Sequence, residues 1–549
     1  MFVELNNFRI RENLSLDPKN IRIINEDLSL ENIIEIIRGE DRVCICIYNE
    51  EFRYIALPAT FHGEIFYIQN GNEVMISDDL YKLAAHLGGV TINKSNYERF
   101  MLKGYFSSED TLFNEIHRFS NFSVYGVYLG NFRKYEIPFT KNVNIEDEKQ
   151  YQKFKDVLNE IVDRKLRGTP CLLLSGGADS RLLLLLMKER IKNLQAVNMQ
   201  YNPSMTINLN DIILAEKMAE IVGCKLHKVC VGFGEKEFDT LYDVVGIMPN
   251  CTHVSIGFDE MLHTVSRLGF DSIWTGQNMD NLYNLGPTGR LSISKAGLGE
   301  ALKRFYLSEE FFLTLEDVEG NPNKITNLVA SLGKYMLRIV RKNAKIYLPN
   351  SSDELIDNFA HSADYLPLSL FKRDTDNKKS AKINPFDIKQ KLYRNKINYF
   401  NSGDAMVIDL LAYKYGINAV FPYTDMKMID FFAGIHLTME DVFYPKRYVY
   451  RYISEFIPKY GKEIAQFTAT KHEKKLHSKN HDILGINEWI DYLLDKTVYG
   501  NGLKKALETV DCNLTDNRSS TRFQLGLSSF WIQTIINKIK EDYGVVISE

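Results

Sequence analysis

The feature that most constrains the fold of this sequence is the segment Ser-Gly-Gly-Ala-Asp-Ser at residues 175–180. It follows the short apolar run CLLLS and precedes the leucine-rich run RLLLLLMKERIK. A short, wholly apolar run that ends at a glycine turn is typical of a buried strand, and the leucine-rich run is typical of a helix. The sequence therefore predicts a strand, a glycine loop and a helix in direct succession.

Strand-like and helical stretches continue to alternate after this unit. In chain order they lie at residues 194–201, 211–223, 225–233, 259–268 and 270–276, and the first, third and fifth are strand-like. Such alternation predicts a doubly wound α/β domain with a mostly parallel sheet. From residue 286 onward the pattern is predominantly helical, which predicts a helical C-terminal extension, and the polar stretch 371–384 predicts a surface loop.

The first part of the chain has a different pattern. Short β-rich runs separated by polar turns fill residues 42–77 and predict a β-meander. Helical stretches at 78–87 and 95–103 and two more strand-like runs follow, so we expect an α+β domain. The polar segment TKNVNIEDEKQYQ predicts a linker after it. We therefore divide the chain into residues 1–145 and residues 146–549.

Composition and charge argue against several classes of partner. The 67 basic and 71 acidic side chains leave a formal charge of −4, so no polybasic surface for nucleic acid or membrane lipid is indicated. The longest leucine run is far shorter than a membrane span, and the first residues lack the pattern of a secretory signal. The seven cysteines show no paired spacing and indicate reduced thiols. We expect a soluble, cytoplasmic protein that binds neither nucleic acid nor membrane.

The glycine loop at residues 175–180 has the chemistry of an anion site. Two glycines let successive backbone N–H groups face one point, and the start of the following helix adds partial positive charge, which suits a phosphate-type anion. Asp179 would be repelled by that anion unless a divalent cation lay between them. The loop therefore indicates a magnesium-bound phosphate. It is not a Walker A loop, because the G-x-x-x-x-G-K-[ST] spacing is missing.

Several segments resemble a known family. SGGADS resembles the pyrophosphate loop of the ATP pyrophosphatases, which cleave ATP to AMP and pyrophosphate while adenylating a carbonyl oxygen. WTGQNMDN and INAVFPYTDMKMIDFFAGI resemble two further segments of the asparagine synthetases, and ISDDLYKLAAHLG and TLFNEIHRFSNFSVYGVYL resemble the glutaminase-type domain of their class B members. The resemblance implies a degenerate glutaminase-like (Ntn-type) domain over residues 1–145 and an adenylating ATP-pyrophosphatase-type domain over residues 146–549.

The resemblance also implies two ligands, ATP and Mg²⁺, and the residues that hold them. Carried over from the family's motifs, these are Ser175, Gly176, Gly177 and Ser180 for the phosphates, Asp179 and Asp280 for the metal, and Leu174, Val197, Met199, Thr275 and Gly276 around the adenine. The family also needs a cation where AMP or pyrophosphate leaves, because negative charge develops there in a dry site.

Three residues are candidates for this catalytic cation. The segment YPKRYVYRYI offers two of them, Lys446 and Arg447. Residue identity favours Lys446, which we prefer, whereas the K-x-x-x-R spacing of the asparagine synthetases favours Arg447. Lys471, at the end of the segment TATK, is the third.

Departures from the family narrow the function. Residue 2 is Phe2 rather than the family's cysteine nucleophile, so the first domain cannot release ammonia by that route. The same loss is shared by β-lactam synthetases and by the macrolactam synthetases that close lasso peptides. Asn418 replaces the glutamate that acts as a base in the β-lactam branch, and an amide cannot accept a proton. YPKRYVYRYI, TATK and the tail from ILGINEW resemble the lasso cyclases.

The main hypothesis is ATP-dependent amide-bond formation through an acyl-adenylate, with macrolactam closure of a ribosomal peptide as the specific reaction. The partners would be a peptide or small carboxylate substrate and, for a lasso peptide, a precursor-peptide peptidase and a leader-binding protein. An intermolecular or ammonia-dependent amide ligase is one alternative, and a nucleotide-binding pseudoenzyme scaffold, indicated by Gln277, Asn281 and Asn418, is another. The acidic net charge and the absence of a catalytic cysteine pair disfavour a tRNA-thiolating enzyme.

Overall fold

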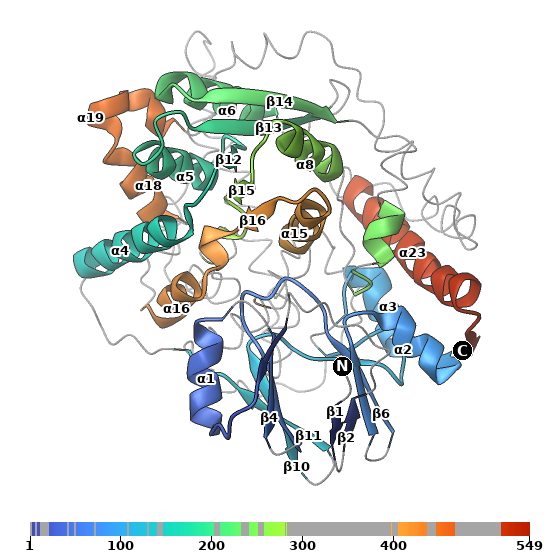
Figure 1. Cartoon of the computed structure of the whole chain (residues 1–549). Helices are drawn as coiled ribbons and strands as arrows, with labels where there is room; N and C mark the ends of the chain where they lie inside the picture. The colour runs from blue at the N-terminus through green and yellow to red at the C-terminus, as the bar shows by residue number, and fades with distance from the viewer. Residues whose placement is uncertain are drawn as a thin grey trace, which may run out of the picture.

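The computed structural model describes residues 3–5, 8–10, 21–40, 43–48, 51–70, 73–106, 109–128, 131–139, 147–201, 209–231, 241–246, 248–250, 257–279, 282, 397, 404–435, 446–466 and 518–548. In this part of the chain, the sheets formed by the first residues lie below a parallel sheet flanked by helices in the view of Figure 1. The structure is a mixed α/β fold, as the sequence predicts.

The first part of the chain contains a five-stranded sheet in the order β11-β10-β5-β4-β3 and a three-stranded sheet in the order β7-β6-β9. The strands are β3 (Ile21–Ile24), β4 (Val43–Tyr48), β5 (Glu51–Leu57), β6 (Phe66–Asn70), β7 (Glu73–Ser77), β9 (His117–Arg118), β10 (Ser123–Tyr128) and β11 (Asn131–Glu136). A short hairpin of β1 (Val3–Leu5) and β2 (Phe8–Ile10) precedes them.

The predicted single meander over residues 42–77 is wrong, although its four strands form where expected. Strand β5 pairs with β4 and β10, whereas β6 pairs with β7 and β9. Between β5 and β6 the side chains of Ala59, Phe61 and Ile65 are buried. Burial of these side chains takes the chain from one sheet to the other instead of returning it beside β5.

The helices of the first part are α1 (Leu30–Arg38), α2 (Leu80–Leu87) and α3 (Lys94–Lys103), so both helices predicted there are confirmed. Helix α2 shows why the sequence is informative here. The side chain of Asp79 accepts hydrogen bonds from the first backbone N–H groups of the helix, and Gly88 ends it in the left-handed conformation with φ 69°. Asp79 is thus an N-cap and Gly88 a C-terminal cap, each a residue type typical of its position.

The sheet after the first part contains five parallel strands in the order β14-β13-β12-β15-β16. They are β12 (Pro170–Leu173), β13 (Gln195–Tyr201), β14 (Lys225–Val231), β15 (Ser272–Thr275) and β16 (Asn418–Val420), with helices α5 (Ala178–Lys188), α6 (Leu209–Val222) and α8 (Phe258–Arg267) between them in the chain. The strand order reverses beside β12. In open α/β sheets, ligands bind at the carboxyl ends of the strands at such a reversal, and the loop 175–180 lies there.

Most of the remaining described chain is helical. Its elements are α4 (Asp147–Lys165), α15 (Asp404–Lys414), η4 (Pro422–Thr424), α16 (Met426–Gly434), α18 (Arg447–Ser454), α19 (Ile457–Tyr460), η5 (Lys462–Ala465), α23 (Arg518–Asn537), η6 (Lys538–Asp542) and the short strand β17 (Val546–Ser548). In the residues that the structure describes, none of the helices has the length and apolar character needed to cross a membrane.

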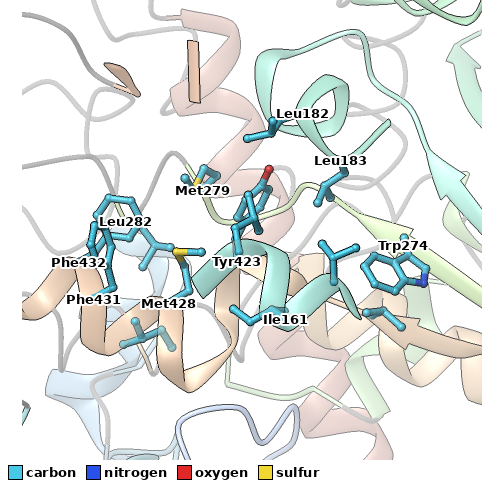
Figure 2. Packing of buried hydrophobic residues seen from close by; sticks show 14 of the residues in the cluster. Ile161, Leu182, Leu183, Trp274, Met279, Leu282, Tyr423, Met428, Phe431 and Phe432 are labelled. Carbon is cyan, nitrogen blue, oxygen red and sulfur yellow. The ribbon is translucent and has the colours of Figure 1, made fainter. Parts of the chain in front are cut away.

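A buried cluster fixes the helix that follows the glycine loop. Leu182 and Leu183 of α5 are fully buried with Trp274 of β15, Tyr423 of η4 and Ile161 of α4 (Figure 2). Burying side chains of this size stabilises a fold by about 1.5–3 kcal/mol each. The apolar face of α5 therefore holds the start of the helix, and the loop before it, in one position.

The end of the described chain packs on its first part. Strand β17 pairs in parallel with β8 (Gly89–Thr91), and α23 lies along α3 (Figure 1). Helix α23 also contacts the second part of the chain, because the indole Nε1 of Trp531 donates to the carbonyl of Met248 at 3.1 Å, and both residues are buried. Residues from both ends of the sequence therefore build the lower half of the molecule.

Candidate active site

The glycine loop is tied together by its two serines. The backbone N–H of Ser175 donates to Oγ of Ser180 at 3.2 Å, and the two hydroxyl oxygens lie 3.1 Å apart. Oγ of Ser180 also donates to the carbonyl of Gly177 at 3.2 Å. Ser180 is buried, whereas Ser175 is exposed. Ser180 therefore shapes the loop from inside, and the Ser175 hydroxyl is available at its surface.

Two glycines are required by close approach of other backbone segments. Gly176 has φ +80°, and a Cβ there would lie 2.2 Å from the carbonyl oxygen of Asp211 in α6. A Cβ on Gly276, which follows β15, would lie 2.8 Å from the backbone nitrogen of Ser180. Both distances are shorter than a side chain can accept. The loop is thus packed between the start of α6 and the turn after β15.

The start of helix α5 is not capped by a side chain. Gly177 is the N-cap residue, with φ −63° and ψ 160°, and it offers no side-chain acceptor to the first turn. The first N–H groups of a helix have no partner within the helix, and they carry the positive end of its dipole. An anion at this point would accept hydrogen bonds from them.

Lys446 reaches this loop from the far end of the sequence. Its Nζ lies 2.7 Å from Oδ2 of Asp179, and the two side chains are only 15% and 13% exposed. Lys446 precedes α18 and has φ 67°, a left-handed conformation that costs a residue other than glycine about 1–2 kcal/mol. A strained lysine that forms a mostly buried ion pair beside an anion-binding loop is typical of a functional residue.

Arg447, the neighbouring candidate, points elsewhere. Its Nη2 lies 2.6 Å from Oδ1 of Asp147 and donates to the hydroxyl of Tyr448 at 2.7 Å. Its guanidinium carbon lies 4.4 Å from the centroid of the Tyr448 ring. Of the two adjacent cations, the structure thus brings Lys446 and not Arg447 to the loop.

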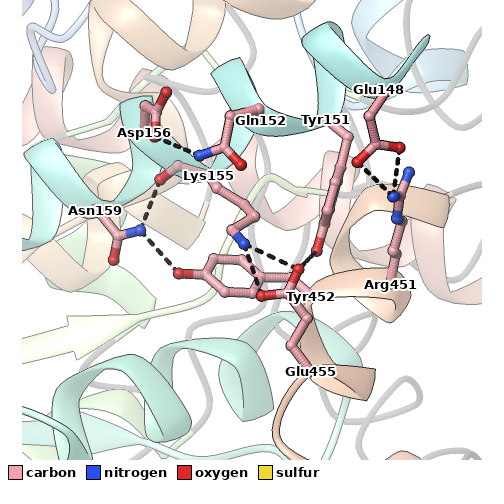
Figure 3. Close-up of polar contacts among 9 residues, drawn as sticks. All are labelled: Glu148, Tyr151, Gln152, Lys155, Asp156, Asn159, Arg451, Tyr452 and Glu455. Atoms are coloured by element: carbon pink, nitrogen blue, oxygen red, sulfur yellow. Dashed lines mark hydrogen bonds and ion pairs between the residues drawn. The ribbon is translucent and has the colours of Figure 1, made fainter.

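Polar contacts hold helix α18, and with it the residue before it, against α4 (Figure 3). Oε1 of Glu455 accepts from the hydroxyl of Tyr151 at 2.5 Å, and Oε2 of Glu455 lies 2.7 Å from Nζ of Lys155. Nδ2 of Asn159 donates to the hydroxyl of Tyr452 at 2.8 Å. Burial, together with the adjacent carboxylate of Glu455, raises the pKa of Tyr151, so this hydroxyl keeps its proton. The position of α18 is therefore set by α4.

Tyr423 is a site residue that the sequence analysis missed. Its hydroxyl donates to the backbone carbonyl of Asp179 at 2.9 Å, and the side chain is fully buried. Burial, and then the charge of Asp179, raises the pKa of Tyr423 well above its usual range, so the group acts as a donor. The signal that could have found it is its place directly after β16, at the carboxyl edge of the sheet.

The residues predicted around the adenine lie at the carboxyl ends of three adjacent strands. The N–H of Leu174 donates to the carbonyl of Val197 at 2.9 Å, and both side chains are buried, while Met199 is partly buried farther along β13. Thr275 is buried at the end of β15, and its Oγ1 accepts from the N–H of Gln277 at 3.2 Å. Asp280, Asn281 and Lys471 lie outside the described residues.

A second polar side chain at this edge was also missed. Nδ2 of Asn198 donates to the carbonyl of Leu174 at 2.7 Å, and its Oδ1 is buried with no hydrogen-bond partner among the described residues. A buried acceptor without a partner is costly. Asn198 therefore offers a hydrogen-bond acceptor to a ligand between β12 and β13.

Asn418, which replaces the family's glutamate in the motif, lies away from the glycine loop. It is the first residue of β16, it is exposed, and its Cα pairs with Ser272 at the start of β15. The glycine loop follows the opposite, carboxyl end of the sheet. The identity of residue 418 therefore gives no information about a base at this loop, and the argument against the β-lactam branch loses that support.

The residues fit a magnesium-bound phosphate. Asp179 provides a hard oxygen ligand in the first turn of α5, beside the uncapped N–H groups. Among the described residues no cluster of three or more metal-ligating side chains occurs. Asp179 would hold Mg²⁺ together with phosphate oxygens and water, which Mg²⁺ usually keeps as ligands in phosphate-transfer sites. The second expected ligand, Asp280, lies outside the described residues.

Comparisons with known proteins give little further information. No family model matches the chain, and no curated protein matches it. Among solved structures, the U34-tRNA thiolase of Methanococcus maripaludis is similar over 39% of this chain and 76% of its own, at 14% identity and a TM-score of 0.20. The glutamine-dependent NAD⁺ synthetase of Acinetobacter baumannii, solved with ADP, is similar over 46% of this chain and 67% of its own, at 13% identity and a TM-score of 0.17. At such TM-scores neither likeness supports an inference.

Proposed function

We propose that the chain is an ATP-dependent carbon–nitrogen ligase that binds Mg·ATP at the loop 175–180. The observation that carries the proposal is the 2.7 Å contact between Lys446 and Asp179 beside the uncapped start of α5. The loop offers N–H donors for phosphate, Asp179 offers a metal ligand, and Lys446 offers a positive charge for the leaving group. When bound, the metal would neutralise phosphate charge.

The proposed reaction has two steps, with ATP as a substrate. A carboxylate oxygen attacks the α-phosphorus, the bond to the β-phosphate breaks, and pyrophosphate leaves with the electron pair. An amine nitrogen then attacks the acyl carbon, the bond to AMP breaks, and the nitrogen loses a proton. Lys446 stabilises the negative charge of the leaving group, and Tyr423 holds the backbone of Asp179 through its hydrogen bond.

For the acceptor, we propose an amine within a ribosomal peptide, so that the product is a macrolactam. A peptide α-amine has a pKa of about 7.7–8.0 and is substantially neutral near pH 7.5, so it needs no strong base. The segment that carries Lys446 supports this choice by its resemblance to the lasso cyclases. A precursor-peptide peptidase and a leader-binding protein would then act with this chain, and the first domain would be a scaffold.

The experiment measures pyrophosphate release with ATP, Mg²⁺ and a precursor peptide encoded beside the gene. We expect peptide-stimulated release and a product lighter by one water, and a loss of roughly 100-fold in Asp179→Asn. Asp163→Asn is the matched control, because Asp163 pairs with Arg190 on the surface and is 63% exposed. ATP binding without AMP or pyrophosphate, across peptides and small carboxylates, would instead favour a nucleotide-binding scaffold.

A further inference from the structure

Arg181 is a buried cation directly after the glycine loop. It is 1% exposed, and its guanidinium donates to backbone carbonyl oxygens in two distant parts of the chain. Nη2 donates to the carbonyl of Gly176 at 2.8 Å, and Nη1 donates to the carbonyls of Ile464, at 3.1 Å, and Gln466. One side chain therefore joins the loop to residues 464–466, at the end of η5.

The charge on Arg181 is retained despite its burial. Burial lowers its pKa to about 10, while Tyr450 and Asp211 oppose that shift, so the guanidinium is still protonated near neutral pH. A buried cation is costly unless its donors are satisfied. Carbonyl oxygens accept from Nη1 and Nη2, whereas Nε is buried with no hydrogen-bond partner among the described residues. The neutral carbonyls do not cancel the charge, so a positive potential remains beside the anion-binding loop.

The bond to Gly176 also sets the direction of an anion donor. The carbonyl of Gly176 and the N–H of Gly177 belong to one peptide unit, and in a trans peptide they point in opposite directions. When Arg181 holds that carbonyl, the N–H of Gly177 turns to the other side of the loop. There, in the part of the chain that the structure describes, it makes a long contact of 3.4 Å to Oγ of the exposed Ser175. This geometry leaves the N–H suited to a ligand oxygen.

The other bonds of Arg181 fix the loop relative to the helix preceded by Lys446. Helix α18 packs on α5, and η5 packs on α18 and α19. The side chain of Gln466 is itself held, because its Oε1 accepts from Nζ of Lys217 in α6 at 2.8 Å. Arg181 thus connects three elements that meet at the phosphate site: the loop, α6 and the segment after α18.

We propose that Arg181 is a positioning residue for the ATP phosphates: it orients the Gly177 N–H and sets the distance between the loop and α18, the helix that follows Lys446. This inference rests on the proposed function, since it assumes that the loop binds ATP. A lysine carries its donors on a single nitrogen, so it lacks the separate Nη1 and Nη2 groups that here reach the segment 464–466 and Gly176. Arg181→Lys therefore keeps the charge and removes the positioning.

The test compares the affinities of Arg181→Lys for Mg·ATP and for adenosine by isothermal titration calorimetry. We expect the Kd for ATP to rise about tenfold and the Kd for adenosine to stay within about twofold, because only the phosphates contact the loop. Arg190→Lys is the matched control, since Arg190 bonds to Asp163 and Asn159 at the other end of α5. Its two affinities should equal those of the wild type.

Equal losses for ATP and adenosine would show a merely structural role and overturn the inference, as would unchanged ATP affinity. If Arg181→Lys does not fold, Lys217→Met tests the same connection, because it removes the hydrogen bond from Lys217 to the side chain of Gln466 while leaving Arg181 in place. We expect about a threefold rise in the Kd for ATP alone, and no change would count against the inference. A wild type that binds adenosine but not ATP would overturn the proposed function itself.

Discussion

Replacing Lys446 by methionine tests the proposed reaction most directly. Unit charges 4 Å apart attract by about 4 kcal/mol at an effective dielectric constant of 20, but most of that is offset by the desolvation of both groups. Lys446 and Asp179 are 2.7 Å apart, with side chains 15% and 13% exposed. A charge-assisted hydrogen bond of this kind contributes about 1.5–3 kcal/mol, so we expect Lys446→Met to lower the free energy of unfolding by that amount. Chemical denaturation would measure it.

The catalytic effect should be larger than the binding effect. Removing one charge that stabilises a transition state lowers kcat by about 10²–10³. The Kd for Mg·ATP should change by less than about threefold, because Asp179 loses a competing cation when Lys446 is removed. Single-turnover pyrophosphate release and calorimetric ATP titration separate the two quantities.

Two further variants make the result interpretable. Lys459→Met removes a lysine whose partner Glu189 is on the surface, and it should leave both quantities unchanged. Arg447→Met should lower kcat much less than Lys446→Met, because Arg447 contacts Asp147 instead of the loop. The reasoning is refuted if kcat in Lys446→Met is unchanged, or if kcat and ATP affinity fall by the same factor.

Three other predictions concern the loop, its support and the sheet edge. Gly176→Ala should destabilise the fold by about 2–5 kcal/mol in urea unfolding, because its Cβ would lie 2.2 Å from a carbonyl oxygen and its φ is +80°. Gly223→Ala is the control: with φ +65° and open space around the Cβ, it should cost about 1–2 kcal/mol. Tyr423→Phe removes the hydrogen bond to the carbonyl of Asp179 and should cost about 0.5–1.5 kcal/mol, with kcat lowered by about tenfold. An unchanged melting temperature would contradict this. Burial, and then the charge of Lys225, lowers the pKa of His227. The contribution of His227 to folding stability is therefore present above pH 6.5 and is lost as the pH falls through the lowered pKa. His227→Gln should reduce this small loss of stability at acid pH, measured as melting temperatures from pH 5 to 8.

The strand–loop–helix unit and the parallel sheet were predictable because local patterns define them. A wholly apolar strand, a glycine turn and a leucine-rich helix leave few alternatives, and the alternation of strands and helices after them favours a parallel sheet. The first part was less predictable, because the choice between β6 and β10 as the partner of β5 depends on pairing far along the chain. Sequence pattern shows where a strand forms but not which strand lies beside it.

Site residues that belong to a sequence motif were predictable, whereas site residues brought in by tertiary contacts were not. The loop residues follow from their spacing, but the choice between Lys446 and Arg447 depends on where α18 begins: Arg447 is its first residue, and adjacent side chains on a helix point about 100° apart. Tyr423 and Arg181 contact partners 244 and 283 residues away, which no local pattern encodes.

The pairing of β17 with β8 has a consequence for how the protein is made. Oγ1 of Thr91 and Oγ of Ser548, on the two strands, lie 3.1 Å apart although 457 residues separate them in sequence. During translation, residues 89–91 leave the ribosome long before residues 546–548, so strand β8 lacks its partner strand β17 during that time. Completion of the first part therefore depends on residues 546–548, and a premature stop before residue 546 would leave the edge of β8 without this partner strand.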